Sequence, residues 1–148
     1  MAGKIVFLNA LPVNAFPDEP MTLFMMPVTL QQLQRFVDIA ITREGLVPVH
    51  YIRHAATLEL VRKYVPQLPE QPSTGLYRWE SRDVIVVITL KSPQRGVEAQ
   101  RVTEGDLDVR IVVGEAGWER ALYCALGRLL TEPELEYMLR HRKATGVQ

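Results

Sequence analysis

The chain has one cysteine, no surplus charge of either sign and no long hydrophobic run. Cys124 has no partner for an internal disulfide, which fits a reducing compartment. Seventeen basic and seventeen acidic residues give a formal net charge of zero, whereas proteins that coat long nucleic acids are usually basic. No apolar stretch approaches the length of a membrane span. We therefore expect a cytoplasmic protein that binds neither a membrane nor long nucleic acid.

Several motifs of familiar enzyme classes are also missing. The sequence contains no glycine-rich phosphate loop, no HExxH zinc motif and no GxSxG nucleophile elbow. The three histidines, His50, His54 and His141, have no carboxylate partner at metal-ligand spacing. We expect no metal and no organic cofactor, so an enzyme of this sequence would use acid–base or substrate-assisted chemistry.

Length and pattern favour a single α/β domain over residues 1–148. With 148 residues, 47% of them hydrophobic, the chain can bury a substantial core. Short apolar runs predict strands and 3.6-residue periodicity predicts helices. Strands are expected at 5–8, 21–26, 47–52, 76–80, 84–90 and 109–113, with 76–80 and 84–90 as a hairpin; helices are expected at 29–40, from about 54 to 65, at 115–130 and at 134–143.

Two of these elements have specific features. Thr29 and Gln32 form a capping-box pattern at the start of the 29–40 helix, whose apolar face predicts a packing role. The 21–26 strand is bracketed by prolines, which indicates a sheet edge.

Polar residues follow the first strand. Asn9, Pro12 and Asn14 come directly after the apolar run 5–8. The carboxyl ends of strands in α/β sheets are where ligands usually bind. An ordinary turn is the alternative, because asparagine and proline are turn residues.

A histidine stands where a strand passes into a helix. His54 lies in or just before the first turn of the helix that Pro66 ends. Unpaired N–H groups and the positive end of the helix dipole suit a phosphate there. Imidazole can donate or accept a proton near neutral pH, so His54 is a candidate for metal-free phosphodiester chemistry. The alternative is a histidine without catalytic function, either at the surface or satisfied by structural hydrogen bonds.

A second polar loop, residues 91–100, leaves the apolar strand 84–90. It carries Arg95 and, three residues later, Glu98. The arginine fork can clamp a phosphate, and the carboxylate can orient it or accept from a ribose hydroxyl. A surface ion pair is the alternative.

In their order and spacing over residues 4–100, these motifs resemble the ring nuclease family of viral type III anti-CRISPR proteins and their CRISPR-associated cellular relatives. The resemblance rests on three motifs, FLNALPVN at 7–14, IRHAATLEL at 52–60 and QRGVE at 94–98, and on the two strands expected before the last motif, an arginine- and glutamate-bearing one at 76–80 and an apolar one at 84–90. It implies a compact domain on a mixed sheet of about five strands, flanked by helices. Residues 101–148, a strand and two helices, would form a C-terminal extension.

The resemblance also implies an activity and a partner. Family members are homodimers that bind cyclic tetra-adenylate and cleave it without metal to linear di-adenylate with a 2′,3′-cyclic phosphate, which switches off type III CRISPR signalling. By this resemblance His54 is the general acid, Arg95 contacts the phosphate and Glu98 positions groups around it. The implied ligand contacts are Asn9, Ala10, Asn14, Arg53 and Arg78. The expected setting is the cytoplasm of a prokaryotic cell, with a virus or its host as the source of the gene.

The chain departs from the family pattern at several positions. Pro12 replaces a serine common in viral members, Arg53 replaces the usual glycine, and Arg78 would substitute for an arginine outside the strand. These differences keep two rivals open. One is a sensor or sponge that binds the ring without cleaving it. The other is a structural protein that shares only the fold.

Overall fold

The computed structural model describes residues 3–91 and 102–115. The predicted C-terminal helices, apart from Glu115, lie outside this part of the chain, as do Arg95 and Glu98. The elements are β1 (Lys4–Leu8), η1 (Val13–Ala15), β2 (Leu23–Val28), α1 (Leu30–Thr42), β3 (Val47–His50), α2 (Ala55–Tyr64), β4 (Val84–Leu90), η3 (Glu104–Asp106) and β5 (Leu107–Gly114).

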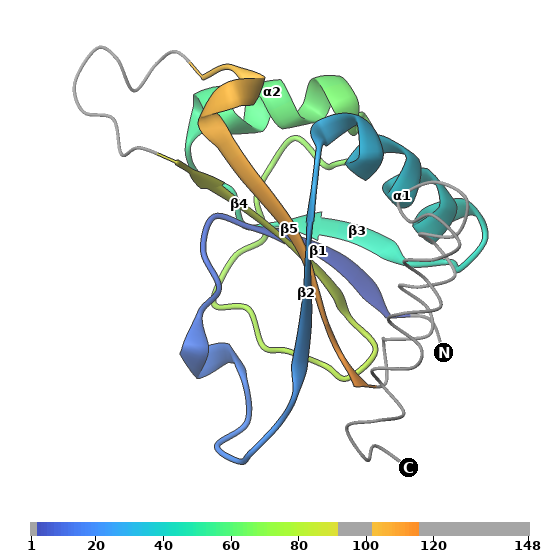
Figure 1. The fold of residues 1–148 in the computed structure, drawn as a ribbon, viewed down its shortest axis with the longest axis vertical. Helices are drawn as coiled ribbons and strands as arrows, with labels where there is room; N and C mark the ends of the chain where they lie inside the picture. The colour runs from blue at the N-terminus through green and yellow to red at the C-terminus, as the bar shows by residue number, and fades with distance from the viewer. Residues whose placement is uncertain (1–2, 92–101, 116–148) are drawn as a thin grey trace.

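The five strands form one mixed sheet in the order β2-β5-β4-β1-β3 (Figure 1). Strand β1 pairs in parallel with both β3 and β4, whereas β5 is antiparallel to both β4 and β2. The predicted α/β class and mixed five-stranded sheet are therefore confirmed. Strand β2 lies at an edge, as its prolines predicted. Strand β5, which the resemblance assigns to a C-terminal extension, lies inside the sheet between β2 and β4.

The two faces of the sheet are covered differently. Helices α1 and α2 lie on one face (Figure 1), where Phe7 and Val86 pack with Leu33 and Phe36 in the larger core cluster. The opposite face is covered by loop residues, and its smaller cluster includes Val6 and the ring of Tyr77. Residues 5–8 of β1 and 84–88 of β4 are buried throughout, because both interior strands are covered on both faces.

Helix α1 begins as the sequence predicts. The Thr29 hydroxyl accepts from the Gln32 backbone N–H at 3.1 Å, and the Gln32 side chain accepts from the Thr29 N–H at 2.9 Å. This reciprocal capping box satisfies two of the four N–H groups left free at a helix start. The helix continues to Thr42, two residues beyond the expected end, and buries Leu30, Leu33, Phe36, Val37 and Ala40.

The predicted hairpin is wrong. Residues 76–80 form no strand, because β1 and β5 already pair with the two edges of β4. The segment is held by other contacts. The Trp79 N–H donates to the Ala15 carbonyl at 3.0 Å, and the Glu80 N–H donates to the Asp83 carboxylate at 3.2 Å. Residues 76–80 are therefore a loop over the face of the sheet opposite α1 and α2.

A buried histidine ends β3 two residues earlier than predicted. The His50 ring has no solvent exposure. Its Nδ1 accepts from the Ile52 N–H at 3.2 Å, and its Nε2 donates to the Pro69 carbonyl at 2.8 Å. Burial lowers the pKa of His50 below its ordinary value of about 6.5. A proton on Nδ1 would also oppose the Ile52 N–H, so the fold holds His50 neutral.

We expect stability to fall in mild acid because of His50. Below about pH 6.5 the unfolded chain protonates this ring while the folded chain does not, so the free energy of unfolding decreases by up to about 1.4 kcal/mol per pH unit. Urea unfolding from pH 7.5 to 5.0 measures the slope. His50→Gln lowers stability at pH 7.5 but flattens the slope; an unchanged slope in this variant would show that another group is responsible.

Candidate functional site

A cavity of about 240 Å³ opens at the carboxyl end of β1. It collects side chains from three segments that are far apart in the sequence: the loop after β1, the β3–α2 junction and the loop before β4. The lining residues are Leu8, Asn9, Ala10, Pro12, Asn14, Tyr51, Arg53, Gly75, Leu76 and Tyr77.

The topology explains why the first two of these segments converge, whereas the third, residues 75–77, precedes β4 and is held by contacts described below. Strands β1, β3 and β4 run in parallel, so their carboxyl ends meet at one edge of the sheet (Figure 1). Asn9 directly follows β1, and Arg53 lies between β3 and α2. Ligand sites of α/β proteins commonly lie at such an edge.

The cavity lining carries little charge. Among the described residues that line it, Arg53 alone is charged, and its side chain is exposed. Asn9 and Asn14 add amide donors and acceptors, while Tyr51 and Leu76 supply aromatic and aliphatic surface. A largely apolar pocket with a few polar groups and one cation suits a small ligand that has an anionic part.

One wall of the cavity is held by a buried carboxylate. Asp83 has no solvent exposure and accepts from the Tyr77 hydroxyl at 2.6 Å and from the Lys4 N–H at 3.1 Å. Burial raises the pKa of the Tyr77 phenol, and the Asp83 hydrogen bond raises it further, so the hydroxyl stays protonated and donates. These bonds join the wall residue Tyr77 to the strands β1 and β4.

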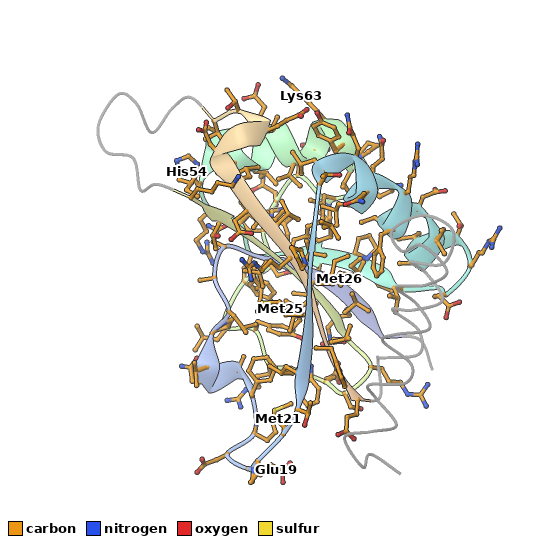
Figure 2. The ribbon with its side chains drawn as sticks, viewed as in Figure 1. Glu19, Met21, Met25, Met26, His54 and Lys63 are labelled. Carbon is orange, nitrogen blue, oxygen red and sulfur yellow. The ribbon has the colours of Figure 1, made fainter. Side chains whose placement is uncertain are left out.

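His54 is the N-cap of α2, as its predicted position required (Figure 2). Its Nδ1 accepts from the Thr57 backbone N–H at 3.2 Å and lies 2.8 Å from the Thr57 hydroxyl. With Nδ1 used as an acceptor, the neutral ring carries its proton on Nε2. His54 therefore has a structural role in addition to the chemical one predicted for it.

The structure brings together half of the predicted site residues. Four of the five predicted ligand contacts, namely Asn9, Ala10, Asn14 and Arg53, line the cavity, with His54 next to Arg53 in the chain. Arg78 is exposed and does not line it. Arg95 and Glu98 lie outside the described residues, so their roles stay predictions.

Sequence reasoning misses the aromatic part of the cavity. The sequence predicts a strand at Tyr51 and a hairpin at Tyr77, and it indicates a function for neither residue. Tyr51 follows His50 at the end of β3, where its position before Arg53 is the available signal. Tyr77 directly precedes the predicted contact Arg78, but its contact with Asp83 could not be predicted, because the sequence pattern of residues 76–80 is that of a strand.

A second cavity, of about 360 Å³, lies between the start of α1 and the β4–β5 connection. Its lining includes the oppositely charged Lys91 and Glu104 and none of the predicted site residues that the structure describes. The capping box already binds N–H groups of the adjoining helix start. The cavity at β1 is therefore the better candidate.

Residues 3–91 and 102–115 contain no group of three or more side chains placed to hold a metal ion. Within the same residues, no helix is long and apolar enough to cross a membrane.

Comparison with known proteins places the fold beside a viral protein. The chain is similar in structure to B116 of Sulfolobus turreted icosahedral virus, with a TM-score of 0.57 over 74% of this chain and 98% of that protein. The two sequences are 14% identical, so the likeness concerns the fold. No protein-family model and no curated protein matches the sequence.

Removing the Tyr77 hydroxyl tests the wall. Tyr77→Phe leaves a buried carboxylate short of one donor, and we expect a loss of about 1.5–3 kcal/mol in the free energy of unfolding. Urea unfolding at pH 7.5 measures the loss. Glu80→Gln is the matched control, because it removes only the exposed ion pair with Lys4 and should change stability little. Equal effects of the two variants would contradict the account.

The capping role of His54 is separable from any chemistry. Asparagine is a good N-cap residue and alanine is a poor one. We therefore expect His54→Ala to lower the free energy of unfolding by about 1 kcal/mol and His54→Asn to retain wild-type stability. Thermal and urea unfolding compare the three proteins. A stability loss in His54→Asn as large as that in His54→Ala would show that capping is not what His54 contributes.

Proposed function

We propose that the protein is a metal-independent ring nuclease that cleaves cyclic tetra-adenylate to linear di-adenylate with a 2′,3′-cyclic phosphate. The observation that carries the proposal is the cavity at the end of β1. It gathers Asn9, Asn14 and the cation Arg53, with the histidine-capped start of α2 adjoining it in the chain. The segments FLNALPVN and IRHAATLEL that resemble the family supply these groups. The similarity of the fold to a virus protein supports a virus or its prokaryotic host as the source.

The volume of the cavity supports a shared ligand. Pockets that hold a whole drug-sized molecule measure about 300–1,000 Å³, whereas this one measures about 240 Å³. A cyclic tetranucleotide is much larger, so one protomer can enclose only a part of it. A two-fold homodimer would present two equivalent cavities to a ring that is itself symmetric. We therefore propose a dimer with the ring across its axis.

In the proposed reaction His54 is the general acid. The ribose 2′-oxygen attacks the adjacent phosphorus, the bond from phosphorus to the 5′-oxygen breaks, and that oxygen takes a proton from His54. A histidine acts as a general acid in its imidazolium form, in which both ring nitrogens carry a proton. In that form Nδ1 would donate to the Thr57 hydroxyl, 2.8 Å away, and Nε2 would give its proton to the 5′-oxygen, which leaves the neutral ring. The 2′-hydroxyl proton passes to solvent or to Glu98. Arg53 and Arg95 would balance the charge on the phosphate.

A binding protein that does not cleave is the second candidate, and one observation favours it. The Nδ1 of His54 is bound to α2, and His54 does not line the cavity. A ring held by Asn9, Asn14 and Arg53 alone would be sequestered without reaching an acid. Such a protein would act as a sensor or sponge.

Cleavage in excess EDTA separates these candidates. We expect wild-type protein to convert cyclic tetra-adenylate to linear di-adenylate with a cyclic phosphate, resolved by chromatography. His54→Asn keeps the helix cap and should bind the ring normally but cleave it about 10²–10⁴-fold more slowly. Arg53→Ala should weaken binding, and Arg53→Lys should restore part of it.

Each result has a distinct meaning. Binding by wild type without cleavage would establish the sensor. Cleavage by His54→Asn at the wild-type rate would remove His54 from the mechanism while leaving the activity. Absence of both binding and cleavage, also with rings of other sizes, would leave a protein that shares only the fold.

A further inference from the structure

We propose that the cavity at the end of β1 is the pocket for a single purine base, with Tyr51 as its aromatic wall and Leu76 as an apolar cover at its mouth. This inference rests on the proposed function and adds to it which part of the nucleotide each protomer encloses. It also gives roles to Tyr51 and Leu76, which lie outside the motifs FLNALPVN, IRHAATLEL and QRGVE.

The chemistry of the lining favours a base over a sugar-phosphate. Apart from Arg53, the residues of 3–91 and 102–115 that line the cavity are uncharged, and Leu8, Tyr51 and Tyr77 present apolar or aromatic surface. A sugar-phosphate would need more cations or hydroxyl partners than these residues offer. A base has a flat π-face that stacks on an aromatic ring. The cation Arg53 would then meet the phosphate outside the pocket.

Tyr51 is held as a fixed surface. Its ring lies 5.9 Å from that of Tyr77, centroid to centroid, at an interplanar angle of 56°. Tyr77 is 6% exposed and is bonded through its hydroxyl to the buried Asp83. Tyr51 itself remains partly exposed and lines the cavity. A ring supported from behind loses little conformational freedom when a base stacks on its open side.

Leu76 is an apolar side chain kept in water at the edge of the cavity. Its side chain is 85% exposed, and it lines the cavity together with its neighbour Gly75. Gly75 has φ of +79°, in the left-handed region that favours glycine, and a Cβ there would meet no atom within 4 Å. The positive φ, and not lack of space, therefore explains why a glycine precedes Leu76. Covering Leu76 with a base would remove apolar surface from water.

The two asparagines match the polar edge of a purine. Asn9 and Asn14 both line the cavity and are exposed, so their amides are accessible to a ligand. A carboxamide offers one acceptor beside one donor, and adenine presents a donor amino group beside a ring-nitrogen acceptor. Pyrimidines also present a donor beside an acceptor, so the preference for adenine would come from the larger area over which a purine stacks.

Titration with single nucleotides tests the pocket without the ring. We would follow the amide NMR spectrum of the full chain during additions of adenosine 5′-monophosphate, uridine 5′-monophosphate and ribose 5-phosphate. With the adenylate we expect saturable changes in the amide chemical shifts of the cavity residues. The uridylate should cause smaller changes, and ribose 5-phosphate should cause no saturable change at these residues.

Two pairs of variants locate the contact. Tyr51→Leu keeps apolar volume but removes the ring, and should weaken adenylate binding roughly 5- to 150-fold; Tyr51→Phe keeps the ring and should retain most of it. Leu76→Ala should weaken binding about tenfold. Val13→Ala is its matched control, because Val13 is 86% exposed but does not line the cavity. The amide spectrum of each variant verifies folding.

The outcomes separate this inference from the proposed function. Equal binding of adenylate and sugar phosphate, no adenylate binding up to about 10 mM, or wild-type affinity in Tyr51→Leu would each overturn the base pocket. Ring cleavage that persists in Tyr51→Leu with unchanged affinity would leave the nuclease standing without the pocket. Selective adenylate binding by a protein that neither binds nor cleaves the ring would leave the pocket and remove the nuclease.

Discussion

Parallel pairing of β1 with both β3 and β4 is the constraint on which the candidate site depends. Parallel strands place their carboxyl ends at one edge, so the segments that leave them must start side by side. Asn9 after β1 and Arg53 after β3 line one cavity for this reason. An antiparallel arrangement of the same strands would send β1 and its neighbours to opposite edges and disperse the cavity.

The wall of the cavity depends on a different kind of interaction. Loop 76–80 has no strand ladder, so hydrogen bonds to Asp83 and to the Ala15 carbonyl hold it. Burying a carboxylate costs free energy unless its oxygens accept hydrogen bonds. The Tyr77 hydroxyl and the Lys4 N–H donate such bonds to Asp83. The same bonds that compensate the buried charge therefore set the position of Tyr77, against which the Tyr51 ring packs. Stability and ligand shape share this network.

His54 links local structure to the chemistry proposed for it. A histidine used as an N-cap has one ring nitrogen engaged with its helix, which leaves the other to face a ligand. The arrangement orients the imidazole without a carboxylate partner. It also explains why alanine is an ambiguous substitution here, since it removes the cap together with the ring, and why asparagine separates the two roles.

The elements with local signals could be predicted from the amino-acid sequence. The capping box of Thr29 and Gln32, the fully apolar β4 and the histidine at the start of α2 were predictable because each depends on neighbours within a few residues or on simple periodicity. The resemblance of short motifs also assigned Asn9, Asn14 and Arg53 to one site. That residues 76–80 form no strand could be seen only in the fold, because β1 and β5 pair with both edges of β4. The tertiary structure alone paired Tyr77 with Asp83 and set Tyr51 in the cavity, because contacts between separate segments depend on strand order, which local patterns do not encode.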